Sequence, residues 1–259
     1  MLFGLGLLNP APSVASPAAP TPISSCKTTI STPGNYKLIG NLTASGATCI
    51  TITVNNVSID LGGHTISGNA SSSTSMFGIT DGGNNLNTIA IVNGTIAGFN
   101  VNIELNDTKG VTIDHVKVTN AVTSSTAGDG GDGIDALDCR NTVSNSKATG
   151  NGGDGIDATK CCNGVSTSTA NDNKGNGIVV TGTVNQVVNC SASGNVSGDG
   201  VYASSPNGSN TWNQVTNGKF AKNGKDGVEL NPGGTMTATP ATSNGRTAFR
   251  SCARPTLCW

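Results

Sequence analysis

Apolar residues recur along the chain in short runs, alternating with polar neighbours and separated by Gly, Asn and Asp. Residues 132–153 and 154–175 are alike, with 13 of 22 aligned positions identical. Each repeat holds three apolar runs that are too short for a helix and typical of strands of three or four residues. A period near 22 with three such runs predicts a solenoid with three short strands per coil.

The three apolar columns keep one register over seven repeats, which predicts a parallel β-helix of about seven to eight coils. Successive coils would hydrogen-bond at about 4.8 Å, so that each column becomes a stack of like residues. Leucine-rich repeats share the period but need a leucine ladder, which the chain lacks. The first column is Ile79, Ile103, Ile134, Ile156, Ile178, Val201 and Val228. The second is Ile59, Ile91, Ile113, Val143, Val165, Val187 and Val215. The third is Ile66, Ile96, Val118, Ala148, Ala170, Ala192 and Phe220.

A further column, mostly Asn, lies two residues beyond the second apolar column. Amide side chains at such a bend can bond to each other from coil to coil, so we predict an asparagine ladder there. His115 falls in this column, which favours a ladder substitution over a catalytic or ligand role, and His64 falls in another column. The column is Asn93, His115, Asn145, Thr167, Asn189 and Asn217.

The segments Cys49–Val54 and Asn56–Ser67, with the Gly-Ile and Gly-Val coils that follow, resemble the pectin-lyase-like superfamily over residues 26–240. The resemblance implies an all-β, single-stranded, right-handed parallel β-helix. It does not select an activity, because the superfamily includes lyases, hydrolases, epimerases and surface proteins. The polygalacturonase motifs Asn-Thr-Asp, Asp-Asp, Gly-His-Gly and Arg-Ile-Lys are absent. Residues 113–115 resemble part of a pectate-lyase Ile-Asp-His motif, without its flanking Trp.

Two connections are longer than a regular turn needs, at residues 67–77 and 119–131. Both leave the third column and return to the first, so we expect neighbouring loops that wall one side of a groove. A third insertion, at residues 204–211, leaves from another corner.

The residue after each inward Ile or Val of the first column must point outward. This predicts one exposed file in which three carboxylates, Glu104, Asp135 and Asp157, stack consecutively. Charged residues follow along the same coils, whereas Asp132, Asp154, Asp199 and Asp226 precede Gly and are interpreted as turn residues. The file is Thr80, Glu104, Asp135, Asp157, Val179, Tyr202 and Glu229, and beyond it lie Asp107, Asp138, Lys160, Lys109 and Arg140.

Three interpretations of this charged face stay open. Asp135 and Asp157 could be metal ligands for calcium, the one cofactor that the pattern suggests. Glu104 and Asp157 could act in acid-base catalysis with Asp135, or Lys109 or Arg140 could act as a lyase base. The face could also be a solvated strand whose repulsion Lys160 and Arg140 relieve. If a substrate binds, Asp138, Lys160 and Tyr202 are the expected contacts.

The composition limits the cellular compartments and the classes of binding partner that fit this chain. The chain has 14 basic and 15 acidic residues, which excludes bulk-charge binding to nucleic acid, and no apolar run is long enough for a membrane span. Eight cysteines favour an oxidising compartment, and no pair has zinc-ribbon spacing. We expect disulfides at Cys26/Cys49 and Cys252/Cys258, and between Cys139 and Cys161, one period apart, with Cys162 as the competitor.

Three parts are predicted: a leader or signal-peptide remnant at 1–25, a β-helix with an N-terminal cap at 26–240, and a C-terminal tail or cap at 241–259. The function we infer is a secreted protein that binds or modifies an acidic polysaccharide or cell-surface glycan. The alternative is a non-catalytic structural or adhesive protein that self-associates, and an aromatic content of 3% favours it because sugars stack on aromatic rings.

Overall fold

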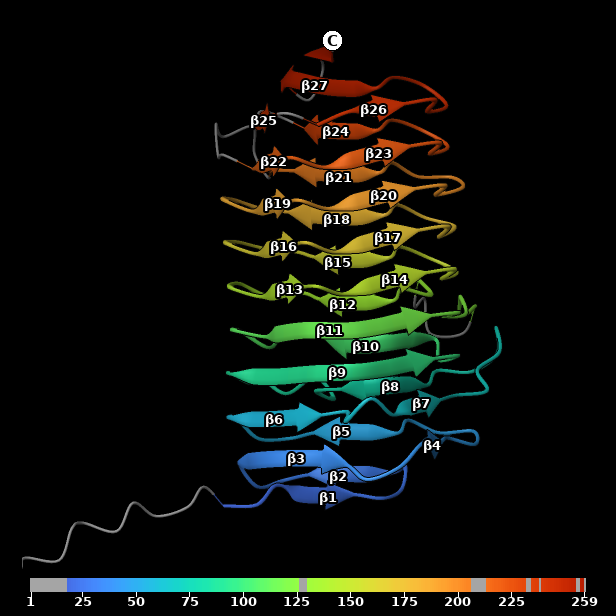
Figure 1. The fold of residues 1–259 in the computed structure, drawn as a ribbon, viewed down its shortest axis with the longest axis vertical. Helices are drawn as coiled ribbons and strands as arrows, with labels where there is room; N and C mark the ends of the chain where they lie inside the picture. Colours follow the sequence, from blue (N-terminus) through green and yellow to red (C-terminus); the bar gives the residue numbers. More distant parts are fainter. Residues whose placement is uncertain are drawn as a thin grey trace, which may run out of the picture.

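The computed structural model describes residues 18–125, 130–205, 213–231, 234–237, 239–254 and 257–258. Strands climb one axis from β1 (Thr21–Ile23) to β27 (Phe249–Arg254), one coil upon the next (Figure 1). All regular elements of the described residues are strands, which confirms the all-β prediction. Nowhere in these ranges is there a helix long and apolar enough to cross a membrane.

Two sheets form the coils. The first sheet carries the first apolar column and is parallel except at its last strand. It comprises β2 (Thr28–Ile30), β5 (Ile50–Ile52), β8 (Phe77–Thr80), β10 (Val101–Leu105), β12 (Ile134–Ala136), β15 (Ile156–Ala158), β18 (Ile178–Thr181), β21 (Val201–Ser204), β24 (Val228–Asn231), β27 and β28 (Leu257–Cys258).

The second sheet carries the other two columns, and in β9 and β11 one strand runs through both. It comprises β1, β3 (Gly34–Leu38), β4 (Leu42–Thr43), β6 (Val57–Asp60), β7 (Thr65–Ser67), β9 (Ile89–Ala97), β11 (Thr112–Thr119), β13 (Thr142–Ser144), β14 (Lys147–Thr149), β16 (Gly164–Ser166), β17 (Thr169–Asn171), β19 (Gln186–Val188), β20 (Ser191–Ser193), β22 (Gln214–Thr216), β23 (Lys219–Ala221), β25 (Thr235–Thr237) and β26 (Ala241–Thr242).

The register confirms the predicted columns. In the first sheet Ile134 is the Cα partner of Ile103 below it and of Ile156 above it. In the second sheet Ile113 pairs with Ile91 and Val143. The column residues are almost completely buried and form one apolar core along the axis. The first sheet also extends the column beyond the sequence pattern, because β2 and β5 precede Ile79 and β27 follows Val228.

The predicted asparagine ladder is wrong in its position. All six residues of that column have a left-handed backbone, with φ between 47° and 60°. Their side chains lie at the surface, where Asn93 and Asn145 donate to Asp60 and Asp114 rather than to each other. Asn is common here because it tolerates the left-handed region, and His115 occupies the same bend with φ 54°.

Two buried asparagine ladders exist elsewhere. In one, Asn173 donates its backbone N–H and its side-chain amide to Asn195 Oδ1, each at 3.1 Å, and the pattern repeats in neighbouring coils. In the other, each backbone N–H donates to the amide oxygen of the next coil, as from Asn163 to Asn185 at 2.9 Å. The first ladder is Asn151, Asn173, Asn195, Asn223 and Asn244, and the second is Asn141, Asn163, Asn185 and Asn213.

Two predicted disulfides are confirmed. Cys139 and Cys161 bridge adjacent coils with their Cα atoms 4.6 Å apart, and Cys26 and Cys49 do so at 4.2 Å. The competitor Cys162 is free and exposed. The backbone pairs Cys252 with Cys258 in antiparallel register, but their side chains lie outside the described residues. Residues 1–17, residues 206–211 of the third insertion and residues 126–129 of the second long loop also lie outside the described residues.

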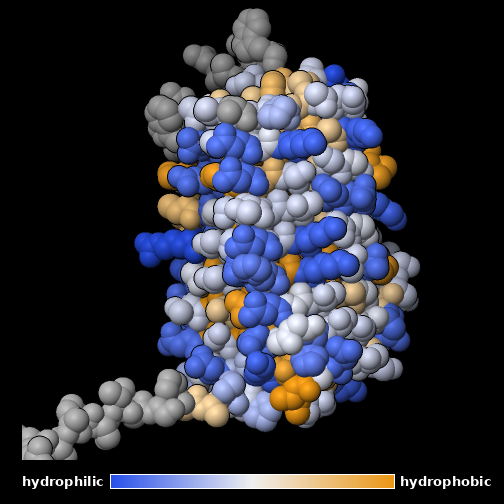
Figure 2. Space-filling model, viewed as in Figure 1, coloured by the Kyte–Doolittle hydropathy of each residue, from blue (hydrophilic) through white to orange (hydrophobic). Residues whose placement is uncertain are grey.

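The face shown in Figure 2 is largely polar, with no broad apolar patch in its described part. Large apolar residues are exposed singly, at Ile39, Val184, Val196 and Phe249. This pattern is ordinary for a solvated surface.

The buried ladder predicts a large stability cost for Asn173→Ala. The change leaves the Asn151 N–H and its side-chain amide without their acceptor inside the coil. We expect the free energy of unfolding to fall by about 2–4 kcal/mol, measured by urea denaturation followed by circular dichroism. Asn35→Ala, at an exposed position of β3, is the control and should cost no more than about 0.5 kcal/mol. Equal losses in both variants would contradict a ladder that stabilises the stack.

Candidate functional site

The predicted carboxylate file lies on the first sheet. Glu104, Asp135 and Asp157 are direct Cα partners on β10, β12 and β15. Full exposure was predicted, and this is wrong: all three side chains are half-buried, and Thr80 and Val179 of the same file are buried. The turns that enter these strands carry two further aspartates, Asp132 and Asp154, whose charges act on Asp135 and Asp157.

Asp132 and Asp154 lie in the turns that lead into β12 and β15, three residues before Asp135 and Asp157 in the sequence. Asp154 accepts the backbone N–H of Asn176 in the next coil, and Asp132 accepts that of Asp154. Their interpretation as turn residues is therefore confirmed, but each also brings a carboxylate close to the file. Sequence reasoning missed this, although the spacing Asp-Gly-Ile-Asp carried the signal.

Burial and like charge shift the protonation of the pair. Burial, followed by the charges of Asp157, Asp132, Glu104 and Asp154, raises the pKa of Asp135 to about 9. Burial, followed by the charges of Asp154 and Asp132, raises the pKa of Asp157 to about 8. One oxygen of each carboxyl, Oδ1, is buried without a hydrogen-bond partner. At neutral pH these groups therefore hold a proton or need a cation.

The predicted cations do not compensate the pair. Lys160 lies 3.6 Å from Asp138 and 4.0 Å from Asp107, so it serves another column. Lys109 and Arg140 are exposed and make no ion pair within the described ranges. The interpretation in which Lys160 and Arg140 relieve the repulsion is therefore wrong.

The remaining predicted residues lie along the same coils and the coils next to them. Asp138 is buried and accepts the Cys139 N–H at 2.7 Å. Tyr202, half-buried, lies between Val179 and Glu229 in the file. Glu104 accepts hydrogen bonds from Thr80 Oγ1 at 2.9 Å and from Asn106 Nδ2 at 3.0 Å, which fix the orientation of its carboxylate.

The two long loops lie side by side, as predicted. Ser124 Oγ donates to the Thr74 carbonyl at 2.7 Å, and Ser125 binds the Ser72 carbonyl through its backbone N–H and its hydroxyl, both at 2.8 Å. A hollow of about 410 Å³ lies on this edge, lined by both loops and by Lys174. The loops thus wall one edge of the coils that carry Asp135 and Asp157.

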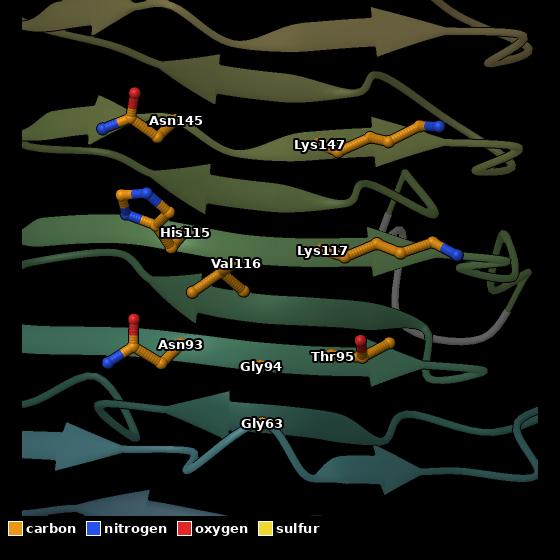
Figure 3. Close-up of a pocket in the computed structure, with 9 residues that line it drawn as sticks. All are labelled: Gly63, Asn93, Gly94, Thr95, His115, Val116, Lys117, Asn145 and Lys147. Atoms are coloured by element: carbon orange, nitrogen blue, oxygen red, sulfur yellow. The ribbon is translucent and has the colours of Figure 1, made fainter.

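A second hollow, of 380 Å³, lies on the second sheet (Figure 3). Its walls include Lys117 and Lys147, which are Cα partners on β11 and β14, and the bend residue His115. His115 Nδ1 lies 2.7 Å from Asp114 Oδ2. Hydrogen bonds from Ser144, Asn145 and His115 lower the pKa of Asp114 to about 2. This hollow is basic, in contrast to the acidic file.

Residues 101–250 match the family model described as the right-handed β-helix region. The chain belongs to the right-handed β-helix family. The match confirms the resemblance and the handedness expected from the sequence. No curated protein matches this right-handed β-helix by sequence.

Solved structures show the same fold. Pectate lyase Pel9A is 14% identical, with a TM-score of 0.58 over 87% of this chain and 69% of that chain. The A-module of mannuronan C-5 epimerase AlgE6 from Azotobacter vinelandii is 16% identical, with a TM-score of 0.61 over 85% and 70%. ORF18 of Geobacillus virus E2 is 12% identical, with a TM-score of 0.54 over 89% and 55%. At these identities the likeness shows the fold alone.

The raised pKa values predict that stability falls with increasing pH. The folded β-helix holds protons on Asp135 and Asp157 up to about pH 9 and 8, because their pKa values are raised, whereas the unfolded chain loses them near the ordinary aspartate pKa of 3.8. The folded state therefore binds more protons between these limits, and the free energy of unfolding decreases across this window. Denaturant titrations in chelator from pH 5 to 9 measure the slope.

The double variant Asp135→Asn/Asp157→Asn should flatten this slope and be the more stable protein at pH 9. Asp114→Asn is the control. The pKa of Asp114 is lowered in the folded protein, so its contribution to the free energy of unfolding is constant above about pH 4 and is lost only at lower pH. Its slope above pH 5 should match the parent. An unchanged slope in the double variant would contradict the assignment.

Proposed function

We propose that this β-helix is a secreted protein that binds and modifies an acidic polysaccharide on the face that carries Glu104, Asp135 and Asp157. The observation that carries the proposal is the half-buried Asp135 and Asp157 pair, with raised pKa values and oxygens that lack a partner. Carboxyl groups with such shifts are concentrated at functional sites.

A carboxyl that stays protonated at neutral pH can donate a proton to a glycosidic oxygen or a hydrogen bond to a uronate carboxylate. Asp135 and Asp157 are suited to that role. Glu104, held by Thr80 and Asn106, is suited to accept a proton. Lys109 and Arg140 at the exposed rim remain the alternative bases, and Lys160, Asp138 and Tyr202 are proposed substrate contacts.

Calcium offers a second way to satisfy the same pair. A hard cation bound by Asp135 and Asp157 would replace the protons and could also bind the acid groups of the polysaccharide. The two disulfides support export to an oxidising compartment. Two proteins of the same fold are named for pectate and for mannuronan, which are anionic polysaccharides. Their names support an anionic glycan as the substrate class.

The alternative is a non-catalytic structural or adhesive protein. Tyr202 is the one aromatic residue in the file, so the face has little surface on which a sugar ring could stack. The basic hollow at Lys117 and Lys147 would then be the better glycan-binding surface, because ammonium groups attract uronate carboxylates directly.

A glycan screen tests the proposal and separates the two faces. The parent is incubated with polyuronates and neutral glycans, with and without calcium, and assayed for unsaturated ends, reducing ends and binding. We expect turnover of a polyuronate, and a loss of at least about 100-fold in Asp135→Asn/Asp157→Asn. Lys117→Ala/Lys147→Ala is the control and should keep the activity.

The opposite result would overturn the proposal. Binding without turnover that is lost in the lysine variant and kept in the carboxylate variant assigns the glycan to the basic hollow and favours the adhesive alternative.

A further inference from the structure

A second group of carboxylates lies higher on the first sheet, outside the site proposed above. Asp199 and Asp226 precede β21 and β24, and Glu229 lies within β24. One oxygen of each carboxylate lies within 4.8 Å of one oxygen of each of the others. Val179 occupies the file between Asp157 and Tyr202, so this group is separated from the Asp135 and Asp157 pair by an apolar position.

The fold fixes two of these carboxylates through the turns. Asp199 Oδ1 accepts the Asp226 N–H at 2.8 Å. Asp226 Oδ1 accepts the Thr247 N–H at 2.8 Å and the Thr247 hydroxyl at 2.7 Å. These bonds run from coil to coil and set both side chains rigidly at the edge of the sheet.

One oxygen of the group is left over. Asp226 is completely buried, and its Oδ2 has no hydrogen-bond partner. A buried carboxylate oxygen without a partner is costly, since burial of charge requires a counter-charge or hydrogen bonds. Its Oδ1 is already used by Thr247, so Oδ2 is the atom free to bind a ligand.

Nearby positive charge does not fill this role. No ion pair of the described residues involves Asp199, Asp226 or Glu229, although Arg250 is the Cα partner of Glu229.

We propose that Asp199, Asp226 and Glu229 bind one calcium ion, with Asp226 Oδ2 as the buried ligand. Calcium takes oxygen ligands at about 2.3–2.6 Å, so two of its ligands can lie up to about 5 Å apart. The limit of 4.8 Å on the spacing of the three oxygens lies within this range, and magnesium, which keeps several of its waters, is less suited to three protein carboxylates. Such an ion clamps the coils of β21 and β24 together, and it is independent of glycan binding at Asp135 and Asp157.

Glu229→Gln is the decisive variant, because Glu229 takes no part in the bonds between turns. Chelator-treated full chain is titrated with calcium chloride by calorimetry, and thermal unfolding is recorded with calcium, with magnesium and with chelator. We expect calcium to raise the unfolding temperature of the parent by mass action. Glu229→Gln should weaken this calcium binding at least tenfold while folding normally in chelator.

Two controls make the result specific. Asp172→Asn removes one exposed carboxylate at a left-handed turn that Asn also tolerates, and it should bind calcium as the parent does. Asp135→Asn/Asp157→Asn should keep the binding that Glu229→Gln removes. If Glu229→Gln does not fold, Asp226→Asn replaces it, since an amide oxygen can still accept the Thr247 bonds.

The site would be overturned by an absence of calcium binding in the parent, by parent-like affinity in the Glu229→Gln variant, or by an equal response to magnesium. Calcium binding lost only in the Asp135 and Asp157 variant would also overturn it, and would support the metal interpretation of the proposed function instead. If Asp135→Asn/Asp157→Asn loses glycan turnover but still binds calcium at the Glu229 site, the calcium site and the proposed glycan site are independent of each other.

Discussion

Satisfying the backbone at each turn is the constraint on which this β-helix depends. Strands bond to strands, but the turns between them bring N–H groups into the interior, where an unpaired group is costly. The chain meets this with side chains that accept from the neighbouring coil: Asn173 and its ladder at one corner, Asn163 and its ladder at another. Aspartates such as Asp226 do the same at the entrance to the first sheet. Polar residues therefore define the coil as strictly as the apolar columns.

The same stacking concentrates charge. A residue in one coil lies directly on its counterpart in the next, so a repeated Asp-Gly-Ile-Asp sequence places four carboxylates together in β12 and β15 and their turns. A turn aspartate cannot be moved away, because its oxygen holds the next backbone N–H. The repulsion is therefore built into the repeat and must be met by protons or by cations. Raised pKa values at Asp135 and Asp157 are the direct result.

The sequence was sufficient for the parts of the fold that repeat. Ile134 and Ile156 one period apart predicted the register, and Cys139 and Cys161 predicted a bridge. Burial of the file and the location of the ladders could not be read in this way. Asn145 and Asn163 both recur with the coil, and only the backbone shows that the first lies on an exposed left-handed bend and the second inside a turn. Periodicity gives the column of a residue but not the direction of its side chain at a bend.

Interruptions of the repeat carry as much information as the repeat itself. Asn176 and Val179 replace both aspartates in one coil, where Asn176 preserves the turn by donating its N–H to Asp154 and accepting that of Asp199 at 2.8 Å. The structural part of the pattern is thus kept while the charge is removed. Asn and Val at these two positions form the same turn without charge repulsion, so stability alone would favour them in every coil. The return of carboxylates at Asp199, Asp226 and Glu229 after this neutral coil therefore argues for two separate acidic sites rather than one continuous charged strand.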